Sequence, residues 1–447
     1  MIFTMLLLPL LLICALLTNQ ASAFPKRHMV KNVPPYLHNI KRSDNGNYQI
    51  PSDVHNGSSK AVFDIKTATS TLDTNTLLSL DAPKLDSING SVFDWWYFDV
   101  VSEANPDDSV TITFFSSTVE AFPFLAANQS SILTAWIWAS FANGTVFADY
   151  VPATVATLTG VDGTHTEGSG HWFPTGIGWG ASTAPQTRYV VSIASEKIQV
   201  HGRLTLTAVS IQFPMRYCLL IRFKTVPHHL PCGVQKDKSI LEIAPHIGWV
   251  NAVPDAVGVV DMNIRGSSLK FQGPGYHDKN WSDRPFMESV ESWYWGHGRL
   301  GPYSIVWFSF LALNDTTNST YVSSYVAKDG NALVSACDDK LLTVRPIGAP
   351  GTTGGRYPPK VGDVPEGFHL DYDLGEEIGH LKVNVSTRAL VAGDGEYYGR
   401  WTGDLVGEVV KPGNDTRGPC SPGSENGSGE ETSLVGVAVF EQFVVVE

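Results

Sequence analysis

The chain has no long stretch in which apolar residues recur every three to four positions, the spacing that an amphipathic helix requires. Charged residues are also scarce, at 17% against roughly 25% in an average globular protein. The 31 Lys and Arg residues are outnumbered by 44 Asp and Glu residues, which gives a net charge of −13. Because no basic stripe is present, the chain is not expected to bind nucleic acid.

Several catalytic signatures are missing as well. No G-x-S-x-G sequence marks a nucleophilic serine, and Gly176-Ile177-Gly178 has no strand-to-helix context for binding a nucleotide. The chain has only five cysteines, at spacings that do not match a zinc site, so no metal is expected. Cys14 lies in the apolar leader, and the other four allow three disulfide pairings. Among these we favour Cys218 with Cys232, which closes a short loop.

The abundant residues are those of strands and turns. The 41 Gly and 27 Pro separate short runs of aromatic, β-branched or alternating residues. Asn143-Gly144 lies between two such runs and predicts a hairpin with a type I′ turn. A chain of 447 residues is longer than the roughly 250 to 300 at which single cores stop growing. We therefore predict an all-β protein of antiparallel barrels or sandwiches, with domains at 51–255 and 256–447.

The N-terminal segment is apolar and ends in Ala21-Ser22-Ala23, which is typical of a cleaved signal peptide over 1–23. The alternative is an uncleaved anchor, since the basic n-region is missing and Pro9 interrupts the apolar run. Residues 24–50 include the dibasic Lys41-Arg42 and predict either a processed pro-segment or a disordered tail. A signal peptide predicts the secretory pathway, with the protein secreted or vesicular and without a membrane span after cleavage. N-glycans are then expected on some of the ten N-x-S/T sites, although not on Asn280, which lies in a packed motif.

Three aromatic motifs carry the candidate site. In a strand alternate side chains share a face, so Asp94 and Trp96 point one way and Trp95, Tyr97 and Asp99 the other. A carboxyl group between large rings is desolvated, which raises its pKa and makes it a candidate general acid. The alternative is that the rings are core and the carboxyl group bonds to backbone.

The second motif is GYHDKNW and the third is WYWGHGR. Alternation places Tyr276, Asp278 and Asn280 on one side of the second, and His297 beside Trp293 and Trp295 in the third. Each histidine has either a role in the site or a structural hydrogen bond. The candidate catalytic residues are Asp94, Tyr276, His277, Asp278 and His297, and the candidate substrate-binding residues are Trp95, Trp96, Tyr97, Trp172, Trp281, Trp293 and Trp295.

Together WWYFD, GYHDKNW and WYWGHGRLGPYSIVWF resemble the fungal lipocalin-like family that contains the Diels-Alderases. The same pattern is similar to kievitone hydratase and, more distantly, to bacterial carotenoid hydratases. The resemblance implies two lipocalin-like antiparallel β-barrel or sandwich domains in tandem, a ligand pocket near their junction and no metal or organic cofactor. It also implies that Asp94 faces the pocket and that Trp401 is a pocket tryptophan.

The resemblance further implies a Diels-Alderase, which forms a ring system by [4+2] cycloaddition of a polyketide-derived linear precursor in fungal secondary metabolism. The His277-Asp278 pair is closer to the hydratase branch, so a secreted hydratase or dehydratase of the kievitone hydratase type is the alternative. A non-catalytic protein that binds hydrophobic ligands is a second alternative. In all three cases the expected partner is a hydrophobic small molecule.

Overall fold

The computed structural model describes residues 40–43, 47–66, 79–161, 167–182, 187–209, 229–232, 238–313, 315, 319–411 and 433–446. The predicted signal peptide and Cys14, Cys218 and Cys420 lie outside these residues. In the described part of the chain, helix is limited to the 3-10 turn η1 (Ser79–Asp81) and to α2 (Phe286–Ser289). Neither is long enough to cross a membrane. The predicted all-β class is confirmed.

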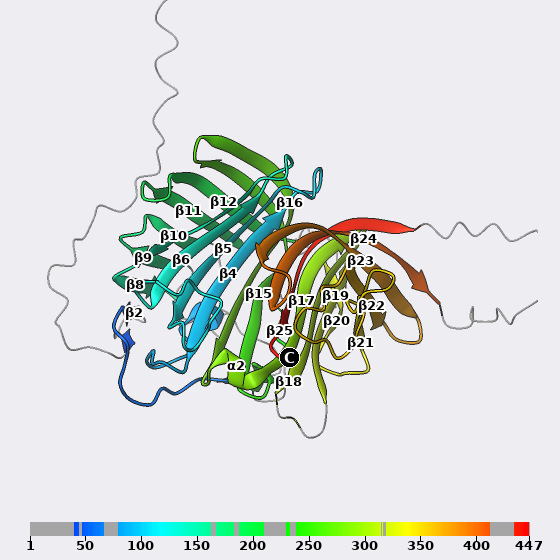
Figure 1. Cartoon of the computed structure of the whole chain (residues 1–447), viewed down its shortest axis with the longest axis horizontal. Helices are drawn as coiled ribbons and strands as arrows, with labels where there is room; N and C mark the ends of the chain where they lie inside the picture. The colour runs from blue at the N-terminus through cyan, green and yellow to red at the C-terminus, as the bar shows by residue number, and fades with distance from the viewer. Residues whose placement is uncertain are drawn as a thin grey trace, which may run out of the picture. The chain divides into compact units, whose positions relative to one another are not determined.

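Strand pairing is antiparallel throughout and builds two large sheets (Figure 1). In order of pairing, the first sheet contains β1 (Lys41–Arg42), β2 (Tyr48–Pro51), β8 (Val155–Thr159), β9 (Gly168–Phe173), β10 (Ile177–Ser182), β11 (Arg188–Ser195), β12 (Val200–Ala208), β15 (Ile247–Ile264), β16 (Ser267–Ser282), β4 (Phe93–Val101), β5 (Ser109–Ser117), β6 (Leu133–Ser140) and β7 (Val146–Pro152), with β14 (Glu242–Ala244) beside β15. The second contains β20 (Asn331–Ala336), β19 (Thr320–Lys328), β18 (Tyr303–Ala312), β17 (Val290–Leu300), β25 (Leu434–Val444), β24 (Tyr398–Val410), β23 (His380–Gly393), β22 (Gly367–Asp373) and β21 (Leu342–Ile347). A small separate pair joins β3 (Asp64–Lys66) to β13 (Lys238–Ile240).

Each large sheet is made by one continuous part of the chain, and the change from the first to the second occurs at α2, between β16 and β17. The predicted domain boundary at 255/256 falls inside β15. The division of the chain into two domains stays a prediction. Pro254 lies within this strand, where irregularities of register between Val250 and Val253 and between Val253 and Ala256 accommodate it.

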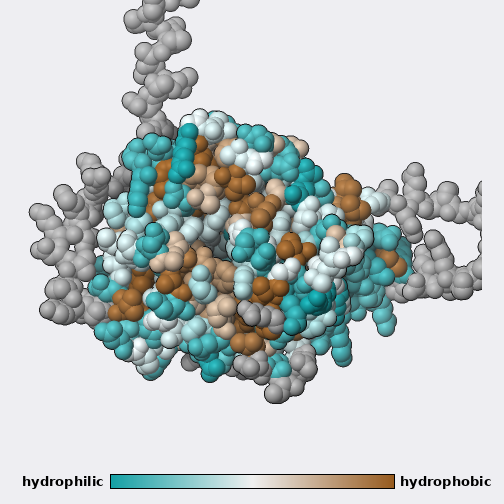
Figure 2. Space-filling view, in the orientation of Figure 1, coloured by the Kyte–Doolittle hydropathy of each residue, from teal (hydrophilic) through white to brown (hydrophobic). Residues whose placement is uncertain are grey.

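The strand alternation divides most of the aromatic residues between three large cores. From β4, Trp96 and Phe98 enter the core of the first sheet. Trp95 and Tyr97 point the other way, into a core that they share with Trp293 of β17. The second sheet has a further core of its own. On the face shown in Figure 2, hydrophobic and hydrophilic residues are interspersed, and the main concentration of aromatic side chains is internal, in the shared core.

The hairpin predicted at Asn143-Gly144 is confirmed as β6 and β7, but the predicted turn type is wrong. A type I′ turn needs a positive φ at both central residues. Of these two residues only Gly144 has one, at +80°. The turn is longer, because the backbone N–H of Phe141 donates to the carbonyl of Thr145 at 2.9 Å and the Asn143 side chain accepts from the Thr145 N–H.

The favoured Cys218–Cys232 disulfide is also wrong, since Cys232 is bonded to Cys337. The physical reason is the position of residues 229–232. His229 pairs with Asn251 of the first sheet through its backbone, and its ring bonds to Ser335 of β20 at 2.8 Å. This segment therefore brings Cys232 to the second sheet. There it bonds to Cys337, which lies 105 positions further along the chain.

Candidate active site

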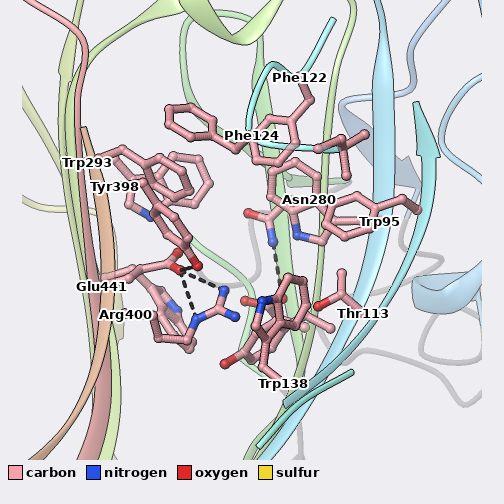
Figure 3. Close-up of a pocket in the computed structure, with 16 residues that line it drawn as sticks. Trp95, Thr113, Phe122, Phe124, Trp138, Asn280, Trp293, Tyr398, Arg400 and Glu441 are labelled. Atoms are coloured by element: carbon pink, nitrogen blue, oxygen red, sulfur yellow. Dashed lines mark hydrogen bonds and ion pairs between the residues drawn. The ribbon is translucent and has the colours of Figure 1, made fainter. Parts of the chain in front are cut away.

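A pocket lies between the two sheets, within the shared aromatic core (Figure 3). Its enclosed free space is about 40 Å³, and about 550 Å³ when the gaps between side chains and the open mouth are included. The first sheet and its loops contribute Trp95, Tyr97, Thr113, Phe115, Phe122, Phe124, Leu125, Trp138, Asp278 and Asn280; the second contributes Trp293, Trp295, Tyr398, Arg400, Glu441 and Phe443. Its wall is therefore mostly aromatic, with a few polar groups.

The rings meet because β4 and β17 each turn one face toward the other sheet. The ring centroids of Trp95 and Trp293 are 6.4 Å apart, and those of Tyr97 and Trp295 are 5.3 Å apart in an edge-to-face arrangement. Such contacts suit aromatic quadrupoles and hold the rings in fixed orientations. Distant parts of the chain thus form one apolar wall.

Asp278 is the carboxyl group of the first sheet that lines this pocket. Its Oδ2 accepts hydrogen bonds from Trp249 Nε1 at 2.8 Å and from the Tyr276 hydroxyl at 3.0 Å, and its Oδ1 accepts from Asn280 Nδ2 at 3.1 Å. Burial raises the pKa of Asp278 to about 8, although the donors from Trp249 and Tyr276 act to lower it. The side chain is therefore mainly a neutral acid at pH 7.

A second carboxyl group, Asp99, lies behind the wall. The Tyr97 hydroxyl donates to Asp99 Oδ2 at 2.5 Å, and His297 Nε2 lies 2.8 Å from Asp99 Oδ1. The His297 ring stacks on Tyr276, with centroids 4.4 Å apart. Burial raises the pKa of Tyr97 well above its usual value, so its phenol stays protonated. This cluster fixes the Tyr97 ring at the pocket wall.

The second sheet contributes an ion pair to the pocket wall, formed by Arg400 and Glu441. Arg400 Nε and Nη2 donate to Glu441 Oε2 at 3.2 and 2.8 Å, because β24 and β25 place the two residues directly opposite each other. The guanidinium carbon lies 4.7 Å from the centre of the Tyr97 ring and 5.6 Å from that of Trp138. These rings and the carboxylate hold Arg400 in one orientation.

The structure divides the predicted site residues into three groups. Trp95, Tyr97, Asp278, Trp293 and Trp295 line the pocket. Tyr276 and His297 lie one layer behind it and bond to the two carboxyl groups. The others lie elsewhere: Trp96, Trp172 and Asp94 in the interior of the first sheet, His277 with them, Trp281 in a small separate core and Trp401 in the core of the second sheet. Their catalytic or binding roles stay predictions.

Asp94 does not face this pocket as expected. It shares a face of β4 with Trp96, forms an ion pair with Lys279 and accepts from the backbone N–H of Lys84 at 3.1 Å. Burial raises its pKa, as expected of a desolvated carboxyl group, but inside the first sheet. The same alternation separates His277 from Asp278: the His277 ring stacks on Phe98, and its Nε2 lies 3.0 Å from Asp81 Oδ1.

Sequence reasoning did not single out Asn280, Arg400, Glu441 or Trp138 as site residues. For Asn280 the alternation with Asp278 in the same motif indicates a position on the same face of the strand, although the sequence analysis considers this residue only as a glycosylation site. Arg400 and Glu441 are 41 positions apart, and their sequence contexts give no sign of pairing. Among the described residues, no group of three or more His, Cys, Asp or Glu side chains is placed to hold a metal ion.

Comparison with known proteins adds three findings. The chain is 36% identical over 299 residues to the quinolone epoxide rearrangement protein asqO of Emericella nidulans, covering 66% of this chain and 74% of that protein. It is 33% identical over 334 residues to the quinolone epoxide rearrangement protein penF of Penicillium thymicola, covering 73% and 84%. The crystal structure of CghA aligns with a TM-score of 0.61 at 15% identity, over 90% of this chain and 98% of that one, which shows the shared fold.

The model of the Diels-Alderase-like family matches residues 60–345, more than half of the chain. This stretch includes all three aromatic motifs from which the resemblance was predicted, and it includes the pocket-lining strands β4, β16 and β17. The prediction is confirmed, and the chain belongs to the Diels-Alderase-like family.

Proposed function

We propose that this protein is an isomerase of secondary metabolism that uses Asp278 as an acid to rearrange an epoxide-bearing hydrophobic precursor. The observation that carries the proposal is the position of the Asp278 carboxyl group, on the wall of an aromatic pocket and among three hydrogen-bond donors. The two relatives named as quinolone epoxide rearrangement proteins support the same reaction class.

In this mechanism Asp278 donates its proton to the epoxide oxygen. One C–O bond then breaks, its electron pair stays on the oxygen, and positive charge develops on carbon. A neighbouring group migrates with its bonding electrons to that carbon, and the Asp278 carboxylate takes back a proton to give a neutral isomer. No atom is gained or lost. The donors from Trp249, Tyr276 and Asn280 stabilise the carboxylate while it exists.

The aromatic wall contributes in two ways. The faces of Trp95, Trp293 and Trp295 attract a developing cation and are too apolar to hold water that would intercept it. Since the enclosed free space is only about 40 Å³, binding of a substrate requires side chains of the pocket wall to shift. In Figure 3 the rings of Phe122 and Phe124 lie together at one end of the pocket.

The predicted [4+2] cycloaddition is the second candidate, and membership of the Diels-Alderase-like family favours it. The aromatic wall would hold a flexible polyene in a reactive conformer. A hydrogen bond from neutral Asp278 to a carbonyl of the dienophile would lower the barrier, by about 2 to 4 kcal/mol for a well-placed donor. Both reactions conserve mass, whereas the hydratase alternative changes it by one water.

The test is incubation of the purified protein with a quinolone that carries an epoxide side chain, followed by mass-resolved chromatography. We expect a product of unchanged mass. Asp278→Asn keeps a hydrogen-bonding side chain but has no acidic proton, so we expect kcat to fall at least about 100-fold. Asp261→Asn makes the same chemical change at an exposed position of β15 and should leave kcat unaltered.

Three results would contradict the proposal. A product heavier or lighter by water would indicate a hydratase or dehydratase. Ligand binding without any product would indicate a carrier. Full activity of a folded Asp278→Asn variant would show that the proton of Asp278 is not used.

A further inference from the structure

Residues 229–232, here called the strap, connect the first sheet to the second and have no part in the mechanism above. The backbone of His229 pairs with Asn251 of β15, with N to O distances of 2.9 and 3.1 Å. At the other end of the strap, Cys232 is bonded to Cys337, which follows β20. The strap is therefore fixed at both sheets, and the His229 side chain is fully buried.

Both ring nitrogens of His229 bond to serines of the second sheet. Nδ1 lies 2.8 Å from the Ser335 hydroxyl, and Nε2 lies 2.9 Å from that of Ser323. Because Ser323 donates its own proton to the carbonyl of Pro231, Nε2 carries the hydrogen of the neutral ring and Nδ1 accepts from Ser335. Burial lowers the pKa of His229 to about 3, so the ring stays neutral. His229 is thus not itself an acid at neutral pH, which leaves it a role in positioning.

Trp249 connects this ring to the pocket. Its indole meets the His229 ring edge to face, with centroids 5.4 Å apart, and lies 5.2 Å from the Phe308 ring. The Nε1–H of the same indole donates to Asp278 Oδ2 at 2.8 Å. Since a hydrogen bond weakens steeply when its angle departs from linear, this bond requires the indole plane to be held. His229 and Phe308 supply that constraint.

We propose that His229 is a positioning residue for the acid of the pocket, because it holds the Trp249 indole against Asp278. The Cys232–Cys337 disulfide holds His229 in turn, so the protein becomes fully active only once this bond has formed. The inference rests on the proposed function, since it describes how the acid of that reaction is controlled. It adds a chemical condition, oxidation, to a pocket whose described lining contains no cysteine.

Other titratable and charged groups also face this part of the pocket. They lie on both sheets: Tyr97 and Asp99 of β4, Tyr276 of β16, His297 of β17, Tyr398 and Arg400 of β24 and Glu441 of β25. Tyr325 of β19 faces His229, with ring centroids 5.4 Å apart, and burial raises its pKa so that its phenol stays protonated. Substitution of His229 alters none of these side chains, so a change in the acidity of Asp278 would report on the Trp249 donor.

The first test follows the pH at which turnover falls. His229→Phe keeps a ring but loses both nitrogens. We expect it to move that pH upward from about 8 by about one unit, because a carboxylate with a weakened donor forms less readily. His229→Gln keeps a polar group toward Ser323 and should restore much of the wild-type profile. His380→Phe makes the same change at an exposed position of β23 and should leave the profile unaltered. An unshifted profile of a folded His229→Phe variant would overturn the positioning role.

A double variant separates positioning from a general loss of stability. Trp249→Phe removes the indole donor directly, so its pH profile should shift in the same direction as that of His229→Phe. If His229 acts through Trp249, the double variant should show no further shift beyond that of Trp249→Phe. Shifts that add up would mean that His229 acts by another route, and would contradict the proposal.

The contribution of the disulfide is measured in the same way. A dithiol reduces it by exchange: the S–S bond breaks, each cysteine gains a proton, and the dithiol is oxidised to a cyclic disulfide. We expect reduction of the wild type to shift the pH profile as His229→Phe does. Cys337→Ser should show the shifted profile with or without the dithiol. A reduced, folded wild type with an unshifted profile would reject control by the disulfide.

The infrared band of the protonated Asp278 carboxyl group gives a readout that needs no turnover. In the difference spectrum between each protein and its Asp278→Asn counterpart, the loss of this band with rising pH follows the titration of Asp278, whatever reaction the protein catalyses. A shifted titration in His229→Phe, with turnover that does not require Asp278, would reject the isomerase proposal alone. An unshifted titration, with turnover that does require Asp278, would reject the positioning role alone.

Discussion

At the scale of single residues, the pocket depends on a carboxyl group whose environment favours its neutral form. Asp278 receives three hydrogen bonds that stabilise a carboxylate, yet burial outweighs them and raises its pKa to about 8. The titratable and charged groups that surround this part of the pocket are Tyr97 and Asp99 of β4, Tyr276 of β16, His297 of β17, Tyr398 and Arg400 of β24 and Glu441 of β25. Of these, Glu441 and Asp99 also raise the pKa of Asp278.

This pKa predicts how stability and activity depend on pH. Between 3.8 and about 8 the unfolded carboxyl group has lost its proton while the folded one keeps it, so raising the pH favours unfolding. We expect the free energy of unfolding of the wild type, relative to Asp278→Asn, to fall by about 1.4 kcal/mol per pH unit over this range. Turnover should fall as the pH rises through about 8, where the acid loses its proton.

Denaturant unfolding of both proteins at a series of pH values measures the difference. The comparison with Asp278→Asn cancels the opposite contributions of Lys84 and Lys279, whose pKa values burial lowers to about 7 and about 8. A stability difference that does not change with pH would show that Asp278 titrates normally.

At the scale of the strand, the sequence predicts which side chains share a face, but it does not predict which face turns toward the other sheet. The sequence was sufficient to group Trp95, Tyr97 and Asp99 on one face of β4, and the structure has them there. Which face meets the other sheet depends on how two sheets pack, and no local pattern encodes that. The family resemblance implied that Asp94 faces the pocket, whereas the structure turns the opposite face of β4, with Trp95, Tyr97 and Asp99, toward the second sheet. Arg400 and Glu441 were missed for the same reason, since only strand register brings them together.

Gly296, on β17 between Trp295 and His297, tests how tightly the second sheet is packed. A Cβ at this position would lie 2.2 Å from the Trp307 ring and 2.6 Å from the Cβ of Phe440. We expect Gly296→Ala to lower the free energy of unfolding by about 1 to 3 kcal/mol, the usual cost of overpacking. Equilibrium unfolding in guanidinium chloride measures this.

The matched control is Gly180→Ala on β10, where the nearest atom to a new Cβ is 4.0 Å away. We expect that variant to stay within about 0.5 kcal/mol of the wild type, as substitutions without a clash usually do. Equal stability of the two variants would mean that the second sheet adjusts to an extra methyl group.

At the scale of the whole described chain, one covalent link joins the two parts that form the pocket. The Cys232–Cys337 disulfide closes a loop with a sequence separation of 105. Loop-closure entropy for a loop near that length stabilises the folded state by roughly 4 to 5 kcal/mol. We expect Cys337→Ser to lower the midpoint of thermal unfolding, and a reducing agent to affect the wild type but not the variant. A variant as stable as the oxidised wild type would contradict this.

A disulfide of this kind forms in an oxidising compartment. We therefore propose that the chain passes through the secretory pathway, which its apolar leader also supports. Expression with an epitope tag, followed by cell fractionation and treatment with a glycosidase, would test this. A tagged protein found only in the cytosol, with free thiols, would contradict the proposal.

Part of the second wall of the pocket comes from beyond the stretch that the family model matches. The family match ends at residue 345, before β22 to β25, whereas Asp278 and its hydrogen-bond donors all lie within it. The strands beyond it supply Tyr398, Arg400, Glu441 and Phe443. Replacing this C-terminal portion with that of a relative should therefore change which molecules the pocket accepts, while Asp278 and its hydrogen-bond donors stay in place.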